Sequence, residues 1–244
     1  GDSSYLGREN RLNIKKNMDN LGIANLLELF STKTSLMWVM EFVGTFAFAI
    51  SGLRLAAAKN FDWYGAYVVG LAVAIGGGTI RDVLLNTTPF WMTNPIYLII
   101  TGVALIYTTI FAKHIVKMKS TFFIFDTVGL SLYAVVGVEK TLGFGYPLWV
   151  ATAMGLLTAT AGGVLRDILI NEIPLIFRKE LYATLCILGG VIFGLCQWLG
   201  LDIVWTEIIS FAVIFLSRVL SVKYHIALPK IKSKAGEDAM NDFE

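Results

Sequence analysis

The chain has 244 residues, of which 56% are hydrophobic and 16% are charged, and its mean hydropathy is +0.67. A soluble globular domain carries about 25% charged residues, so this composition favours lipid as the solvent and argues against a soluble fold. The net charge of +2 is distributed between the apolar runs rather than gathered in one patch, which leaves no footprint for nucleic-acid binding.

Seven apolar runs follow one another along the chain. A transmembrane helix needs about 20 apolar residues to cross a hydrocarbon core of about 30 Å, and these runs meet that length. The predicted fold is therefore an all-α integral membrane protein with seven transmembrane helices. The runs cover residues 36–58, 62–85, 95–112, 121–138, 147–170, 181–199 and 203–220.

Tryptophans support these boundaries independently. All six lie within a few residues of a predicted helix end, where the headgroup region suits an amphipathic ring. They are Trp38, Trp63, Trp91, Trp149, Trp198 and Trp205.

Lysine and arginine gather in the loops on one side of the predicted membrane. On the other side Lys140 is the one basic residue between helices, although the N-terminal tail adds basic residues that weaken the contrast. The positive-inside rule then predicts a cytoplasmic C-terminus and an external N-terminus. The first side carries Lys59, Lys113, Lys117, Lys119, Arg178, Lys179, Lys223, Lys230, Lys232 and Lys234, and the tail carries Arg8, Arg11, Lys15, Lys16 and Lys33.

An internal repeat is the most informative feature of the sequence. A shift of 85 residues aligns 77–86 with 162–171 and Pro89 with Pro174, and it continues upstream without a gap. Each copy holds three predicted crossings, an odd number, so the second copy enters the membrane from the opposite side. The predicted organisation is a polar segment 1–35, a first three-helix repeat 36–120, a second three-helix repeat 121–202, a seventh helix 203–222 and a polar tail 223–244.

Glycines interrupt the second apolar helix of each repeat. Gly76, Gly77 and Gly78 fall in the first copy, and Gly162 and Gly163 in the second. Each costs about 1 kcal/mol relative to alanine inside a helix, so something must offset that cost. One interpretation is close packing of helix backbones. The other, which we favour from the sequence, is a pair of broken helices that meet near the membrane midplane.

An Arg-Asp pair follows each group of glycines. Arg81 and Asp82, and equally Arg166 and Asp167, place four formal charges at membrane depth or close to the interface. Such residues are rare in membranes and are typical of ion or substrate paths. Neighbours on a helix point about 100° apart, so we predict cross-pairing of each arginine with the aspartate of the other copy. The alternative is that the pairs only fix a helix end.

The repeat also aligns two acids near the ends of the first and fourth helices. Glu41 corresponds to Asp126 under the 85-residue shift. Charges at helix ends are most often anchors. Because an acid stands at both positions, lining of a water-filled vestibule is kept as a second hypothesis.

Motifs of enzymes and metal sites are absent from the sequence. It contains no G-x-S-x-G, H-E-x-x-H or G-x-x-x-x-G-K-[ST] run, and the triple glycine lies within an apolar helix rather than after a strand. Neither His114 nor His225 has a partner at metal-ligand spacing. We therefore expect no enzyme, cofactor or metal.

Two copies of G-G-x-x-R-D in the second helix of each half, followed by a lone seventh helix, resemble the trimeric intracellular cation (TRIC) channel family in its bacterial and archaeal branch. The resemblance covers about residues 36–220. It implies a homotrimer in which each subunit has its own pore, flanked by glycine-broken helices two and five. Ala161 stands where the first copy has Gly76, so a less pronounced second break is expected. No Lys-Glu-Val tripeptide of the animal members is present, which favours a prokaryotic plasma membrane.

The function expected from this resemblance is a monovalent-cation channel that passes K⁺. Permeation of Na⁺ is left as an open alternative, and membrane lipids are the expected surroundings. Two helix breaks facing each other across a pseudo-two-fold axis could line a hydrated constriction with backbone carbonyls, Thr79 and the two aspartates. The alternative is a secondary transporter of a small solute such as glycine, because inverted repeats with broken helices are also the usual plan of transporters. Related prokaryotic proteins have been labelled glycine transporters.

Overall fold

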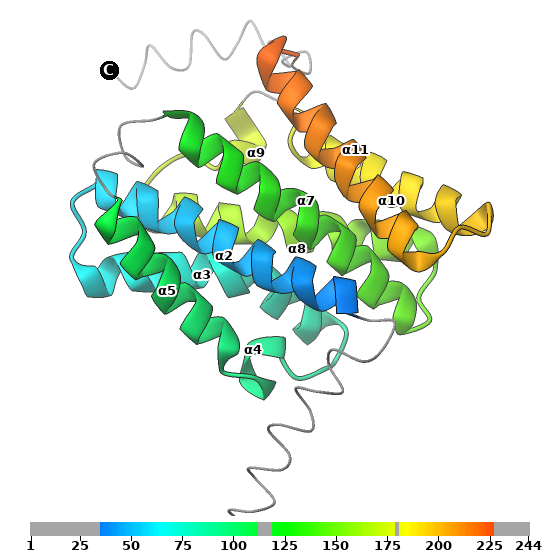
Figure 1. Ribbon diagram of the computed structural model, residues 1–244, viewed down its shortest axis with the longest axis horizontal. Helices are drawn as coiled ribbons and strands as arrows, with labels where there is room; N and C mark the ends of the chain where they lie inside the picture. Colours follow the sequence, from blue (N-terminus) through cyan, green and yellow to red (C-terminus); the bar gives the residue numbers. More distant parts are fainter. Residues whose placement is uncertain (1–34, 112–118, 179–180, 227–244) are drawn as a thin grey trace, which may run out of the picture.

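The computed structural model describes residues 35–111, 119–178 and 181–226, and the predicted polar termini fall almost entirely outside these ranges. All regular structure in the described residues is helical (Figure 1). The helices are α2 (Ser35–Ala58), α3 (Trp63–Leu84), α4 (Phe90–Thr93), α5 (Ile96–Ile110), α7 (Lys119–Gly143), α8 (Leu148–Leu169), α9 (Leu175–Arg178), α10 (Ala183–Trp198) and α11 (Ile203–Lys223).

An all-α membrane fold is confirmed, whereas the number of spans is not. Within the described residues, five helices are long and apolar enough to cross a membrane: α2, α3, α7, α8 and α11. The other two apolar helices, α5 and α10, have 15 and 16 residues. At 1.5 Å per residue they are about 22 and about 24 Å long, shorter than a typical hydrocarbon core of about 30 Å. Seven crossings therefore remain a prediction.

The boundary of α7 differs from its predicted range. The helix continues to Gly143, five residues beyond the predicted end at Val138, and takes in Glu139 and Lys140. Hydropathy ends a predicted span at charged residues. The helix continues because Lys140 finds a partner inside the protein, the carboxylate of Asp82 at 3.0 Å.

Helices α3 and α8 end in the same way, as the repeat requires. The backbone turns into the left-handed region at Asn86 (φ 54°) and at Asn171 (φ 56°), which are equivalent under the 85-residue shift. Asparagine tolerates this conformation better than most residues. After each of these turns the chain begins a short helix, α4 after α3 and α9 after α8 (Figure 1).

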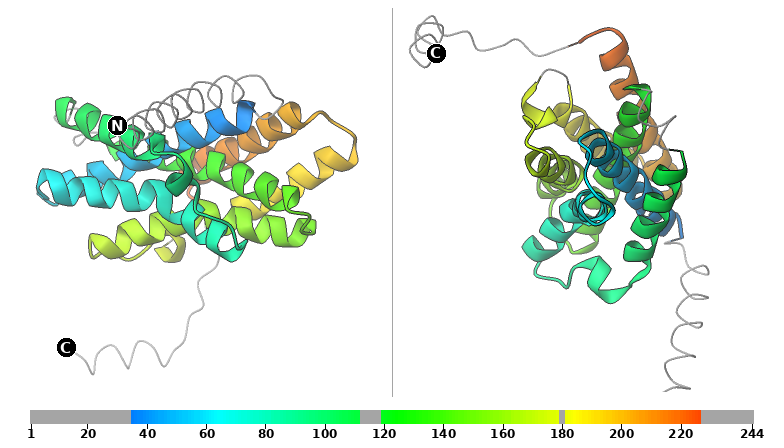
Figure 2. Two further views of the ribbon diagram at one scale, coloured as in Figure 1. Left: turned by 90° about the horizontal axis from the view of Figure 1, so that it is seen from below. Right: turned by 90° about the vertical axis from the view of Figure 1, so that its left-hand side faces the viewer.

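Equivalent helices of the two halves pack antiparallel. On α2 and α7, Gly44 lies against the Tyr133 ring while Gly129 lies against the Phe48 ring. Phe48 and Tyr133 are themselves equivalent, and their rings stack with centroids 5.4 Å apart. Contacts of this kind require a pseudo-two-fold axis through the α2–α7 pair. The colour gradients in Figures 1 and 2 show the same opposite chain directions. The two halves are thus inverted, as predicted.

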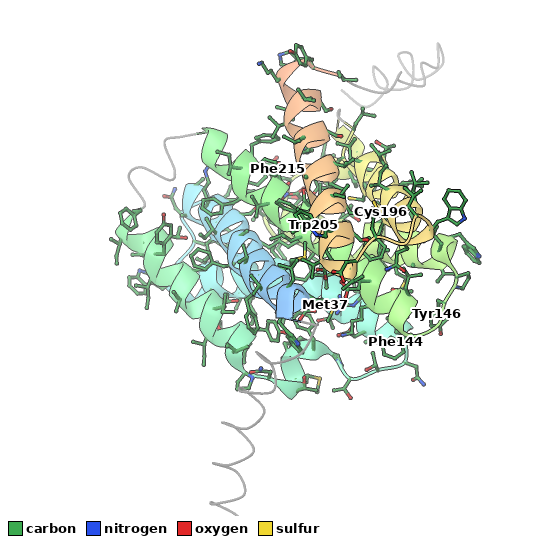
Figure 3. The ribbon with its side chains drawn as sticks, turned by 45° about the vertical axis from the view of Figure 1, so that its right-hand side comes forward. Met37, Phe144, Tyr146, Cys196, Trp205 and Phe215 are labelled. Atoms are coloured by element: carbon green, nitrogen blue, oxygen red, sulfur yellow. The ribbon has the colours of Figure 1, made fainter. Side chains whose placement is uncertain are left out.

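Helix α11 stands outside this duplicated core. It packs against α7 and α10, and its Trp205 and Phe215 side chains are visible in Figure 3. Large apolar side chains are exposed on many helices, which is expected of a surface that faces lipid. Among them are Trp63, Trp149, Trp198 and Trp205, each at or near a helix end.

Candidate functional site: two buried charge clusters

The first charge cluster joins Glu41 of α2, Arg81 and Asp82 of α3, Tyr97 of α5 and Lys140 of α7. Arg81 donates through Nε to Asp82 Oδ1 at 2.8 Å, and its Nη2 lies 3.8 Å from Glu41 Oε1. The Tyr97 hydroxyl donates to the other oxygen of Glu41 at 2.8 Å. Lys140 Nζ adds a second cation to Asp82 at 3.0 Å. All except Lys140 are fully or almost fully buried.

The second charge cluster joins Ser51 of α2, Asp126 of α7, Arg166 and Asp167 of α8, and Tyr182 before α10. Arg166 donates through Nε to Asp167 at 2.8 Å and through Nη1 to Asp126 at 2.5 Å and to Ser51 Oγ at 2.8 Å. Within the described residues, Arg166 Nη2 and the Tyr182 hydroxyl are buried without a hydrogen-bond partner. Both lie next to Gly163, whose missing side chain leaves room for them.

The predicted cross-pairing of the Arg-Asp motifs is wrong. Each arginine binds the aspartate that follows it, because the long side chain folds back along the helix to reach its neighbour. Helices α3 and α8 are antiparallel and cross near Gly77 and Gly162. Arg81 and Arg166 each lie four residues beyond that crossing, about 6 Å in opposite directions, so the two motifs diverge.

The two aspartates also have a different place from the one predicted. They lie in the last turn of α3 and α8 rather than in the first turn of a following half-helix. Asp82 Oδ2 accepts from the Phe90 backbone N–H, and Asp167 Oδ2 accepts from that of Leu175, both at 2.9 Å. Phe90 and Leu175 are the first residues of α4 and α9. Each aspartate therefore ties the returning loop to the buried arginine.

The predicted helix breaks are wrong as well. Helix α3 runs unbroken through Gly76–Gly78, and α8 runs unbroken through Gly162 and Gly163. Instead, Gly77 lies directly against the Thr158 carbonyl and Gly162 against the Val73 carbonyl, so a Cβ at either would collide with backbone. Close helix packing, the other interpretation, offsets the cost of glycine. No backbone carbonyl of α3 or α8 is freed by an interruption at these glycines, and a constriction of that kind is not present.

Thr79 is occupied within its own half. Its hydroxyl donates to the Ile75 carbonyl at 2.7 Å and accepts from Trp91 Nε1 at 3.0 Å. The threonine thus helps to hold α4 against α3. Its role in lining a pore stays a prediction.

Glu41 and Asp126 are neutralising partners of the buried arginines in this structure. They are 2% and 1% exposed, and neither lines either of the two cavities described next. A vestibule role for these two acids stays a prediction.

Two cavities open near the end of α2 where Lys59 lies. The first, about 250 Å³, is lined by Leu55, Lys59, Phe122, Asp167 and Glu172 among others, and we call it the Asp167 cavity. The second, about 330 Å³, lies between α2, α3 and α5 and has Asp62 as its charged lining residue. Of the two, only the Asp167 cavity reaches a charge cluster.

Several members of the clusters were missed in the sequence. Tyr97 and Tyr182 are equivalent under the 85-residue shift, so a complete reading of the repeat would have found them. Outside the two clusters, Tyr133 was missed as well: its hydroxyl lies 2.8 Å from Thr45 Oγ1 and donates to the Ala74 carbonyl, and the repeat gave no signal for it because its equivalent is Phe48. Lys140 carried none either, because its equivalent is Leu55.

The chain is similar to several known bacterial membrane proteins. It is 34% identical to the UPF0126 inner membrane protein YadS of Escherichia coli (strain K12) over 197 residues, which cover 80% of this chain and 95% of that protein. It is 33% identical to a UPF0126 membrane protein of Vibrio cholerae over 198 residues, with 80% and 83% covered. The matches therefore cover most of the length of both relatives.

Solved structures with the same fold include TRIC cation channels. The TRIC channel orthologue from Rhodobacter sphaeroides superimposes with a TM-score of 0.74 at 35% identity, covering 79% of this chain and all of that one. A prokaryotic TRIC channel crystallised in 0.5 M KCl gives 0.73 at 31% identity, with 80% and 99% covered. Channels, not enzymes, are thus what this structure resembles.

A family model matches both halves of the duplication separately. It is described as "Glycine transporter", and it covers residues 38–113 and 123–198. Both matches contain one G-G-x-x-R-D motif and one charge-cluster arginine. The chain therefore belongs to this family of multi-pass membrane proteins, described as glycine transporters, and to the prokaryotic branch of the TRIC channels.

Proposed function

We propose that this protein is a K⁺-permeable monovalent-cation channel with one conduction path in each subunit of a homotrimer. The observation that carries the proposal is the match to a TRIC channel. The match covers the whole length of that channel at 35% identity, with the same helical arrangement. In the proposal the chain crosses a prokaryotic plasma membrane seven times, with the N-terminus outside and the C-terminus in the cytoplasm.

The charge clusters suggest how such a path would work without broken helices. The acids of the two charge clusters would attract cations. Side chains, rather than backbone carbonyls freed by a helix break, would line the conduction path between the clusters. The described conformation is closed in this proposal, because the Arg81 and Arg166 side chains are fully buried within the clusters. Opening would require the arginines to move away from Glu41 and Asp126.

The deciding measurement is a recording from purified protein in a planar bilayer under a K⁺ gradient. Discrete unitary currents that reverse near the K⁺ potential are expected. Asp82→Asn and Asp167→Asn should change their amplitude, while Gly102→Ala, at a position with open space around it, serves as the matched control. Absence of unitary currents from well-folded protein would contradict the channel.

Assembly and orientation have separate tests. Cross-linking in native membranes should stop at three subunits. A Lys117→Cys variant should react with an impermeant maleimide only from the cytoplasmic face, and the native Cys186 and Cys196 should stay silent because both are buried. Labelling from outside intact cells would reverse the proposed orientation.

A glycine transporter is the second candidate, favoured by the description of the matching family. Within the described residues, Arg81 Nη1 and Arg166 Nη2 are buried without a hydrogen-bond acceptor, and after a rearrangement both could donate to a substrate carboxylate. Radiolabelled glycine counterflow in liposomes tests it. Saturable counterflow without unitary currents would replace the channel with the transporter.

A further inference from the structure

The two aspartates of the repeated motif differ in what neutralises them. Asp82 Oδ1 has two cationic partners, Arg81 Nε at 2.8 Å and Lys140 Nζ at 3.0 Å. Asp167 forms its ion pair with Arg166 Nε at 2.8 Å, and no second one is found among the described residues. The duplication has therefore kept the guanidinium in both halves and the ammonium in one.

The 85-residue shift shows what replaces the ammonium. Lys140 corresponds to Leu55, and Leu55 lines the Asp167 cavity. Where the first half places a lysine against its aspartate, the second half has a shorter, uncharged side chain and an open space of about 250 Å³. That volume has room for several water molecules of about 30 Å³ each, or for a cation that keeps part of its hydration shell.

We propose that the Asp167 cavity binds one monovalent cation, K⁺ or Na⁺, which takes at the Asp167 carboxylate the place that the Lys140 ammonium takes at Asp82. This proposal rests on the proposed channel function, because the site would hold a permeating ion next to the last turn of α8. An ammonium group and a hydrated alkali cation carry the same single charge, and both seek carboxylate oxygens.

The remaining groups around the cavity fit a single charge. The Asp167 carboxylate has about four lone-pair positions, of which Arg166 Nε and the Leu175 N–H use two. A second carboxylate, Glu172, lies at the mouth and is paired with Lys59 Nζ at 2.8 Å. Arg166 is shared between Asp126 and Asp167, so these ion pairs leave one carboxylate charge in excess. Arg54 and Arg218 lie over the rings of Phe122 and Tyr182 and do not line the cavity.

The Asp167 cavity opens to the surface beside the Lys59–Glu172 ion pair. The Lys59 and Glu172 side chains are 45% and 38% exposed, whereas the Asp167 side chain behind them is 5% exposed. Phe122 forms another part of the lining and lies under Arg166, with the guanidinium carbon 4.7 Å from the ring centroid. The cavity thus leads from solvent to the second charge cluster, whereas Asp82, at 0% exposure, contacts no described cavity.

The test exchanges the two positions of the repeat. Wild-type crystals soaked in thallium(I) should show an anomalous peak in the Asp167 cavity, and KCl should raise the melting temperature relative to N-methyl-D-glucamine chloride at equal ionic strength. Leu55→Lys should abolish the peak and weaken the KCl response at least tenfold, because the new ammonium occupies the site. Leu55→Met, of similar length without charge, should keep both.

The reverse variant and the outcomes that overturn the proposal complete the design. Lys140→Leu should create a second thallium peak beside Asp82. A wild-type protein that conducts K⁺ without a peak in the cavity overturns the ion site and leaves the channel standing. A wild-type protein with the peak but without unitary currents keeps the ion site and overturns the channel. A Leu55→Lys protein that folds and retains the peak also overturns the site.

Discussion

The two charge clusters come from one duplicated motif and yet differ in how they are closed. In the first, Glu41 reaches Tyr97 and Lys140 covers Asp82. In the second, Asp126 is one methylene shorter, the equivalent Tyr182 hydroxyl has no hydrogen-bond partner among the described residues, and a cavity stands where the lysine would be. The comparison teaches that the duplication preserved the backbone arrangement of the two halves. The length of the acidic side chain and the presence of Lys140 decided which groups the buried acids contact.

The largest difference between the halves should come from removing the arginines. Arg166→Met leaves Asp126 and Asp167 buried without their cation, and breaking a buried ion pair costs about 3–5 kcal/mol. Arg81→Met should cost less, roughly 1–3 kcal/mol, because Lys140 still neutralises Asp82 and Tyr97 still donates to Glu41. Unfolding in sodium dodecyl sulfate, followed by tryptophan fluorescence, measures both. Equal losses would break the comparison.

The glycines at the α3–α8 crossing should show what the halves share. Gly77→Ala and Gly162→Ala each drive a methyl group into a backbone carbonyl of the other helix, and overpacking of this kind costs about 1–3 kcal/mol. The two losses should agree closely because the crossing is symmetric. Gly102→Ala, in α5 with nothing nearby, should stabilise by about 0.5–1 kcal/mol through helix propensity. If Gly77→Ala destabilised the protein and Gly162→Ala did not, the α3–α8 crossing would not be symmetric.

The equivalent tyrosines should respond differently to loss of the hydroxyl. Tyr97→Phe removes the donor to Glu41 and leaves a buried carboxylate oxygen without a partner, which costs about 1–3 kcal/mol. Tyr182→Phe removes a hydroxyl that has no partner among the described residues, so we expect a change close to zero. Thermal denaturation in detergent measures the pair. A destabilising Tyr182→Phe would reveal a partner, such as a bound water, in the second cluster.

The smallest effect is expected at the mouth of the Asp167 cavity. Lys59→Met breaks an ion pair with Glu172 whose side chains are both more than a third exposed. Solvent screens such pairs, so stability should change by about 0–1 kcal/mol. The same denaturation assay checks it, with Lys223→Met at the end of α11 as a matched surface control. A loss above that of Tyr97→Phe would mean that the pair supports the cluster behind it.

Much of the architecture was predictable from the sequence. The helical membrane class, the duplication and the inversion followed from apolar runs, the 85-residue shift and the odd number of crossings per copy. The equivalent left-handed Asn86 and Asn171 and the equivalent capping by Asp82 and Asp167 show how faithfully the motif carries local geometry. These properties depend on residues close together in the chain.

The errors arose where the sequence has two physical solutions. Glycines within an apolar helix can either break it or let another helix approach, and the choice depends on whether Thr158 and Val73 carbonyls lie opposite them. Adjacent Arg and Asp can face different partners or bind each other. Only the antiparallel crossing of α3 and α8, which carries the two motifs apart, selects the second arrangement.

The sequence by itself therefore determined the solvent, the repeat and the residues that carry charge into the membrane, because hydropathy and periodicity are local quantities. The tertiary structure alone decided which buried charges neutralise one another. Coulomb energy in a medium of low dielectric constant depends on separations of a few ångströms. Those separations are set by how helices from distant parts of the chain pack, as when Lys140 of α7 meets Asp82 of α3 and leaves Asp167 beside an open cavity.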